Sequence, residues 1–124
     1  MPLPGTHTLN TEHLTGYTPS CGASPVAAYM RAPFRGRILK FTGILGGAIT
    51  TADGTVTVTN ITKGTAIGTF TITQAGSAAG QLQSAAPSTV AVSYVDEDDV
   101  LAFTPSGAGG ANVPLHISAA IRSQ

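Results

Sequence analysis

The 124-residue sequence predicts an all-β fold, an antiparallel β-sandwich that is jelly-roll-like, with an extended N-terminal arm. The composition has 15 Gly and 8 Pro but few Glu or Lys, which disfavours long helices and favours short strands joined by turns. Apolar and polar residues alternate over several short runs, as in half-buried strands. Turn residues separate the runs, and none of the runs is long enough for a helical crossover between parallel strands.

The predicted strands show a period of two and begin after residue 25. Val56 and Val58 alternate with threonines behind an Asp53-Gly54 turn pair, which gives the clearest example. Residues 74–87 are predicted to form a loop of small residues. The predicted strands cover residues 26–34, 35–45, 55–60, 66–73, 88–95, 100–105 and 112–122.

In residues 35–45 the alternation places Leu39, Phe41 and Leu45 on the buried face of the strand. Gly43 then falls at the position of a bulge or bend.

Residues 1–25 contain four prolines and three glycines and no sustained period of either 2 or 3.6. This pattern predicts an irregular arm with at most a short turn near Leu9 to Leu14. We therefore divide the chain into an arm of residues 1–25 and a β-sandwich domain of residues 26–124.

Charge and cysteine content exclude several classes of function. Charged residues make up 10% of the chain and the formal net charge is zero, so the positive field that attaches proteins to nucleic acid is absent. Neither a signal peptide nor an apolar run of membrane-spanning length is present, so we expect no membrane partner. Cys21 is the single cysteine, which excludes an intrachain disulfide and is typical of a chain folded in a reducing cytoplasm.

The run Asp96-Glu97-Asp98-Asp99 holds most of the acidic side chains of the protein. Clustered carboxylates suit calcium, but adjacent acids in a strand connection point to different sides, and the spacing of a calcium loop is absent. We predict a solvated turn between two strands. Whether this turn binds calcium or pairs with a basic neighbour, such as the region from Arg31 to Lys40 of another subunit, remains open at this point.

No catalytic grouping is apparent. His7 and His13 lie in the arm and His116 points outward from the last predicted strand, so no metal-ligand pair forms. Nucleophile elbows and phosphate-binding glycine loops are also missing. The sequence therefore predicts neither an enzyme nor a bound cofactor or metal.

Four of the six basic residues fall within ten positions, as Arg31, Arg35, Arg37 and Lys40. Such a cluster either protects a strand edge from aggregation or binds a carboxylate-bearing partner. Both interpretations remain open at this point.

Several of these segments together resemble the small jelly-roll head-decoration, or cement, proteins of tailed bacteriophages. The resemblance rests on Ala32 to Phe34 with Gly36, on Gly47 to Asp53, on the loop from Gln74 to Gly80, and on Asp98-Asp99 before Val100. It covers roughly residues 26–122. Relatives more often carry Gly at the position of Asp98.

The resemblance implies a virion protein, made in the host cytoplasm, that binds the outer surface of the head and clamps neighbouring subunits of the major capsid protein. It also implies a homo-oligomer, either a dimer or a trimer. We expect the arm to drape over capsid subunits or a sister copy. The residues expected at such interfaces are Leu3, Leu9, Leu14, Tyr17, Arg31, Arg35, Arg37, Lys40, Asp96, Glu97 and Asp98.

A second class of function is a receptor- or carbohydrate-binding module of a phage fibre or tail, because β-sandwiches often serve that way. Sugar stacking uses exposed aromatic rings, and this chain has no Trp and three Tyr.

Overall fold

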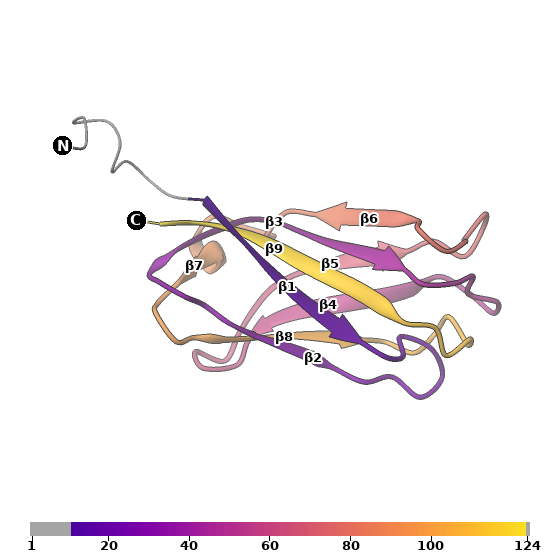
Figure 1. The fold of residues 1–124 in the computed structure, drawn as a ribbon. Helices are drawn as coiled ribbons and strands as arrows, with labels where there is room; N and C mark the ends of the chain where they lie inside the picture. Colours follow the sequence, from indigo (N-terminus) through magenta and orange to yellow (C-terminus); the bar gives the residue numbers. More distant parts are fainter. Residues whose placement is uncertain (1–10, 124) are drawn as a thin grey trace.

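The computed structural model describes residues 11–123, which form a sandwich of two antiparallel sheets (Figure 1). Sheet A has the strand order β1-β9-β3-β6, with the short β7 also pairing with β3, and sheet B has the order β2-β8-β4-β5. Consecutive strands therefore alternate between sheets at several points, which is the jelly-roll arrangement. The all-β sandwich prediction is confirmed.

The strands of sheet A are β1 (Thr11–Thr18), β3 (Gly36–Leu45), β6 (Leu82–Ala85), β7 (Tyr94–Val95) and β9 (Leu115–Ser123). The strands of sheet B are β2 (Ala28–Arg31), β4 (Gly54–Asn60), β5 (Thr65–Ile72) and β8 (Val100–Pro105). A single 3₁₀ turn, Ala91–Ser93, precedes β7 within the described residues.

Buried and more exposed residues alternate strictly along β4 and β9, which lie inside their sheets. Val56 and Val58 of β4 are fully buried, whereas Thr55, Thr57 and Thr59, which alternate with them, are half-buried on the outer face. In β9 the buried residues from Leu115 to Ile121 alternate with partly or fully exposed ones. No described helix is long and apolar enough to span a membrane.

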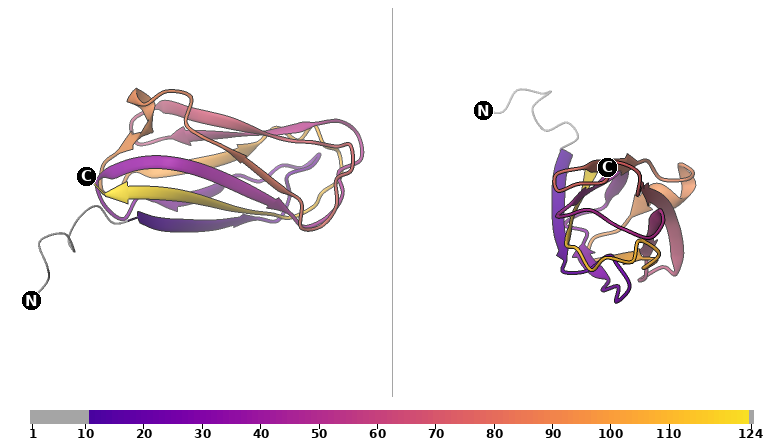
Figure 2. Two further views of the ribbon diagram at one scale, coloured as in Figure 1. Left: turned by 90° about the horizontal axis from the view of Figure 1, so that it is seen from above. Right: turned by 90° about the vertical axis from the view of Figure 1, so that its right-hand side faces the viewer.

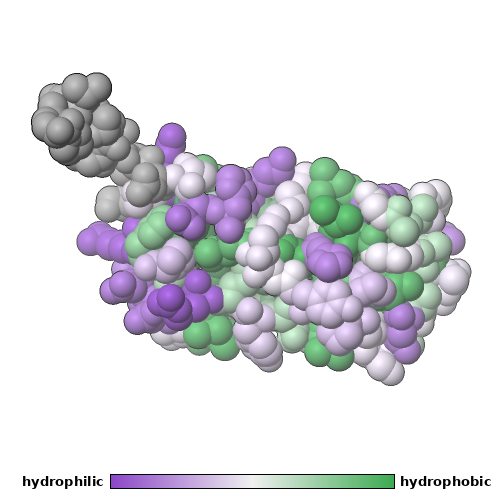
Figure 3. Space-filling view, in the orientation of Figure 1, coloured by the Kyte–Doolittle hydropathy of each residue, from purple (hydrophilic) through white to green (hydrophobic). Residues whose placement is uncertain are grey.

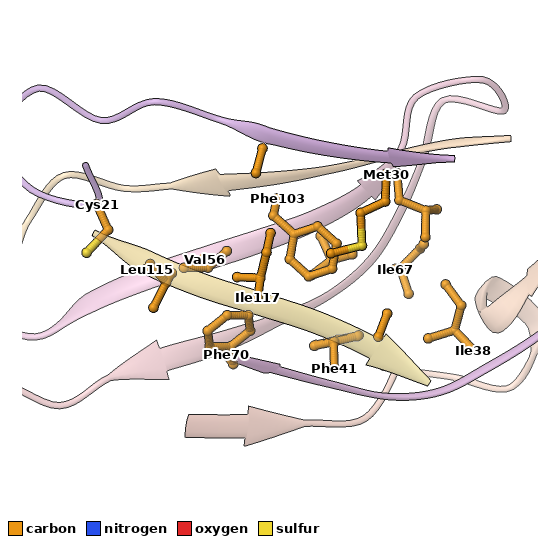
Figure 4. Packing of buried hydrophobic residues seen from close by; sticks show 14 of the residues in the cluster. Cys21, Met30, Ile38, Phe41, Val56, Ile67, Phe70, Phe103, Leu115 and Ile117 are labelled. Atoms are coloured by element: carbon orange, nitrogen blue, oxygen red, sulfur yellow. The ribbon is translucent and has the colours of Figure 1, made fainter. Parts of the chain in front are cut away.

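The core fills the space between the two sheets (Figure 4). Phe41 of β3 lies at its centre, with its ring centroid 6.0 Å from that of Phe70 and 6.4 Å from that of Phe103. Gly43 faces the same space, because a Cβ there would lie 2.7 Å from the ring of Phe70. The glycine thus makes room for an aromatic ring and is not a bulge.

The bulge of β3 lies instead at Leu39. Ile38 pairs with Ile121 and Lys40 pairs with Ala120, so Leu39 is the extra residue in the ladder. This insertion reverses the alternation, and Ile38 is the buried residue while Leu39 is only half-buried. The prediction that Leu39 faces the core is wrong for this reason.

The expectation of an irregular segment is wrong for Thr11 to Thr18, which form β1 and pair antiparallel with β9 along their whole length. The strand was hard to recognise because its inward side carries Leu14 as its one large apolar residue. Gly16, also on that side, leaves space that Met30 fills, since a Cβ on Gly16 would lie 3.0 Å from Met30 Cε. Leu3 and Leu9 lie outside the described residues.

Two further segments differ from expectation. The predicted loop of residues 74–87 contains β6, which pairs with β3. In the predicted strand of residues 88–95, only Tyr94 and Val95 pair with β3. The 3₁₀ turn interrupts the rest of this predicted strand. Within it, Ser93 Oγ donates a hydrogen bond to the Val90 carbonyl.

The connection from β1 to β2 is anchored to the loop before β9. Cys21 N–H donates to the Val113 carbonyl, and Ser20 Oγ hydrogen-bonds Asn112 Oδ1 at 3.0 Å. Gly22 lies so close to this loop that a Cβ would meet the Ala111 carbonyl oxygen at 1.8 Å. Cys21 is 3% exposed and burial raises the pKa of its thiol, against a lowering by a backbone hydrogen bond.

Candidate functional site

The acidic run forms a tight turn between β7 and β8, as predicted, although the expectation that the turn is solvated is wrong for Asp99, which is buried. Asp99 N–H donates to the Asp96 carbonyl and closes the turn, and Asp98 N–H donates to the carbonyl of Ala32 beside β2. Asp98 adopts a positive φ of 70°, a left-handed conformation that glycine adopts with least strain. The backbone at this position therefore suits glycine better than aspartate.

Asp99 is the buried member of the turn, at 4% exposure. Its Oδ2 accepts hydrogen bonds from the Asn60 amide and from Asp96 N–H, both at 2.9 Å, and lies 3.5 Å from Lys63 Nζ. Burial on its own raises the pKa of this carboxyl. The hydrogen bonds from Asp96 N–H and Asn60, together with the charge of Lys63, outweigh burial and place the pKa below its ordinary value.

Basic side chains of the same chain surround the turn. Arg31 pairs with Asp98, Lys63 Nζ lies 2.9 Å from Asp96 Oδ2, and the Arg35–Asp96 contact is longer, at 4.0 Å. The hydrogen bond to Asp96 is the largest cause that raises the pKa of Lys63, and desolvation opposes it. The acidic turn thus finds its ion-pair partners within the chain, where the sequence suggested another subunit.

An open pocket of about 400 Å³ lies beside these charges and is lined by Arg35, Gly36, Lys63, Tyr94, Val95 and Asp96. The carboxylate of Asp96 in this lining is already paired with Lys63 and Arg35. Residues 11–123 contain no group of three His, Cys, Asp or Glu side chains placed to hold a metal ion. These contacts hold β7, β8 and the β4–β5 turn together and so stabilise the fold.

A second candidate site is the outer face of sheet A. Tyr17, His116, Ile44 and Leu82 lie directly opposite one another on β1, β9, β3 and β6, so they form one row across the sheet. The Tyr17 and His116 rings are 4.9 Å apart. Tyr17, Ile44 and Leu82 are 53%, 42% and 58% exposed, respectively. We call these four residues the apolar row.

The next row on this face consists of hydroxyl groups. Thr15, Ser118, Thr42 and Ser84 again lie opposite one another across the four strands. Thr42 Oγ1 and Ser118 Oγ share a hydrogen bond. A pocket of about 270 Å³ lies between the two rows, over Gly16 and Ile117.

Basic residues occupy the far end of the same face. Arg37 and Arg122 lie directly opposite each other, and Lys40 is exposed nearby on β3. Arg37 Nε is buried and makes no hydrogen bond. The described residues provide no ion pair to any of these three side chains, which we call the basic corner. In Figure 3 the strongly hydrophilic surface gathers toward the end where the C-terminus lies.

The structure brings some of the predicted interface residues together and separates others. Tyr17, Arg37 and Lys40 share the outer face of sheet A, whereas Arg31, Arg35, Asp96 and Asp98 join in the charged turn. Leu14 is half-buried against the core, and Glu97 is exposed in the turn.

Sequence reasoning missed His116, Ile44 and Leu82 as neighbours of Tyr17. The outward position of His116 was visible in the alternation, but only the pairing of four strands creates the row. Asn60 and Lys63, the partners of Asp99, were also missed because they are distant in sequence.

No family model matches the chain, and no curated protein matches its sequence. A chain of the cyanophage Pam1 capsid has the same fold, with a TM-score of 0.61 and 14% identity over 100% of this chain and 93% of that chain. The acidic stable capsid of Helicobacter pylori bacteriophage KHP30 contains another, with a TM-score of 0.55 and 14% identity over 90% and 86% of the two chains. Both of these similar chains come from phage capsids.

A carbohydrate-binding module is also similar. CsCBM6-3 from Clostridium stercorarium, solved in complex with cellobiose, has a TM-score of 0.48 and 16% identity over 95% of this chain and 83% of that chain. At 14% identity, the likeness to the two capsid chains shows a shared fold alone.

Proposed function

We propose that this chain is a structural protein of a phage virion, a decoration or cement protein that binds the outside of the head and clamps neighbouring major capsid subunits without catalysing a reaction. The observation that carries the proposal is the outer face of sheet A. The apolar row exposes Tyr17, Ile44 and Leu82 on three of its four strands, with the His116 ring between Tyr17 and Ile44. Exposed apolar surface of this kind is typical of protein-binding sites. The fold shared with chains of two phage capsids supports this function.

The basic corner gives the same face a way to recognise its partner. Two like charges directly opposite each other destabilise a sheet, and a partner carboxylate between Arg37 and Arg122 would relieve that repulsion. We therefore place the capsid contact on this face, with the apolar row supplying affinity and the basic corner supplying orientation.

The test measures binding of the purified protein to heads that lack it. We expect Ile44→Lys to lower occupancy about tenfold or more, because it places an ammonium group in the apolar contact. Ile61→Lys is the matched control, since Ile61 is 50% exposed but lies in the β4–β5 turn. Equal occupancy of the two variants would contradict the choice of face, and absence of binding by the unaltered protein would contradict the function.

The role expected for the N-terminal arm stays a prediction for residues 1–10. A variant that lacks these residues keeps β1 whole, so it separates their contribution from that of the sheet. We expect lower occupancy and lower heat resistance of the decorated heads. Unchanged occupancy and heat resistance would remove the arm from the proposal.

Carbohydrate binding is a second candidate, favoured by the pocket between the two rows. Hydroxyl groups of Thr15, Thr42 and Ser118 line it, and the ring pair of Tyr17 and His116 lies at its edge. A glycan array with the isolated protein tests this function. Specific binding that Tyr17→Ala abolishes and Tyr29→Ala retains would favour it over capsid decoration, because Tyr29 is similarly exposed on sheet B.

A further inference from the structure

The four outer edges of the two sheets differ in how they are protected from pairing with another strand. In sheet B, β2 has four residues and is followed by Pro33, and its last residue Arg31 is held by Asp98. The edge of β5 is covered, because both the N–H and the Oγ of Ser88 donate to the Ile67 carbonyl. Short length, proline and a covering segment are the usual protections of a sheet edge.

In sheet A, the β6 edge is also short, at four residues, and Pro87 follows soon after it. Among the described residues, none of these protections is found at the β1 edge. It runs for eight residues, TEHLTGYT, without Pro, Lys or Arg, and pairs with β9 in one unbroken register. The left view of Figure 2 shows β1 at the rim of its sheet.

Within the part of the chain that the structure describes, the backbone of β1 keeps unused hydrogen-bonding capacity. In an antiparallel ladder, alternate residues direct their N–H and C=O groups away from the neighbouring strand. Within residues 11–123, the backbone of β1 pairs with β9 alone. Such an edge is a template for an added strand.

We propose that the edge of β1 binds the same edge of a second copy of this chain, antiparallel and about a two-fold axis, so that one sheet continues through both copies. An antiparallel strand is complementary to itself under such an axis, which makes the second copy the natural occupant. This proposal does not rest on capsid decoration.

The pleat restricts the register of the pair. Residues that lie opposite each other on antiparallel strands point to the same face of the sheet. In a pair of identical strands, the two-fold axis therefore passes between one residue and the same residue of the other copy. We place it at Thr15, where His13 of one copy faces Tyr17 of the other on the outer side. This ring pair repeats the Tyr17–His116 contact within the chain, and Glu12 meets Thr18, so no like charges oppose each other.

Disulfide trapping tests both the pairing and its register. In the proposed dimer the two copies of Thr15 are neighbours, whereas the two copies of Thr11 lie about 26 Å apart at about 3.3 Å per residue. We expect mild oxidation to link Thr15→Cys into a covalent dimer and to leave Thr11→Cys unlinked. Thr104→Cys, exposed on the central strand β8, is the control, and the buried Cys21 is common to all variants.

Molar mass in solution gives the second measurement. We expect light scattering to give twice the chain mass of 12.4 kDa, and Thr15→Lys to shift the mass toward the monomer while Thr104→Lys leaves it unchanged. Thermal unfolding of each variant checks that the fold persists. A monomeric or threefold mass, or equal cross-linking of Thr11→Cys and Thr15→Cys, would overturn the proposal. Because capsid heads are absent from both measurements, the result is independent of the decoration function.

Discussion

The carboxylate of Asp99 accepts a hydrogen bond from the Asn60 side chain at 2.9 Å, deep enough that both residues are buried. The contact joins the turn before β8 to the last residue of β4, although 39 positions separate the two in sequence. Asn60 Oδ1 in turn accepts from Lys63 N–H, so the β4–β5 turn belongs to the same network. The acidic run, whose clustered carboxylates would suit calcium, therefore holds together one end of the sandwich.

Asp99→Asn should lower the free energy of unfolding by about 1–3 kcal/mol, because a neutral amide oxygen accepts more weakly from the two N–H donors and leaves Lys63 without a carboxylate at this position. Urea denaturation measures this loss. Glu97→Gln in the same turn is the control, since Glu97 is exposed, and its effect should stay within about 0.5 kcal/mol. Equal effects of the two substitutions would show that the network is not stabilising.

The stabilisation from Asp99 should depend on pH. Because its folded-state pKa lies below the ordinary 3.8, the contribution is fully present above that value and is lost as pH falls through the folded-state pKa. The raised pKa of Lys63 acts in the opposite direction, with its contribution present below 10.5 and lost as pH rises through the folded-state pKa.

Urea denaturation at a series of acidic pH values measures the dependence on Asp99. The difference in unfolding free energy between the unaltered protein and Asp99→Asn should shrink as the carboxylate becomes protonated. A difference that stays constant down to the lowest pH at which the protein folds would contradict the assigned direction of the pKa shift.

Asp98→Gly tests the strain of the left-handed residue. The substitution also removes the ion pair with Arg31, in which both side chains are more than half exposed, so the comparison is made in an Arg31→Gln background. In that background we expect Asp98→Gly to raise the free energy of unfolding by about 1 kcal/mol, because glycine adopts a φ of 70° with less strain than aspartate. A loss of stability in that background would mean that the Asp98 side chain supports the turn through other contacts.

Gly22→Ala should destabilise the fold by about 2 kcal/mol or more, because the added Cβ would overlap the Ala111 carbonyl and force two hydrogen-bonded loops apart. Gly54→Ala is the control, since its nearest neighbour would lie at an ordinary 3.7 Å. Thermal unfolding compares the two. Similar melting temperatures would contradict the tight approach of the two loops.

The prediction of strands was most accurate where a strand has paired neighbours on both sides. In β4 and β9 every inward position is buried beneath the opposite sheet, so the sequence must alternate strictly there. Edge elements carry a weaker signal. Inward positions of β1 and β6 need few large apolar residues, and the bulge at Leu39 changes the alternation of β3 in a way that depends on its pairing with β9.

In the candidate sites, too, contacts between residues that are neighbours in sequence could be predicted, whereas contacts made by folding could not. Asp96 to Asp99 are adjacent in sequence, so their turn could be predicted from local chemistry. The partners of Asp99 could not, because Asn60 and Lys63 reach it through the folding of another strand pair. The apolar row likewise combines residues from four strands, and no window of sequence contains them.

Composition and neighbouring residues indicate the all-β class, the place of most central strands and the turn at the acidic run. The folded chain alone reveals that Thr11 to Thr18 complete a sheet, that the acidic turn pairs with Lys63, and which side chains share the outer face of sheet A. Strand order and register are set by burial and hydrogen bonding between segments far apart in the chain, so no local pattern encodes them.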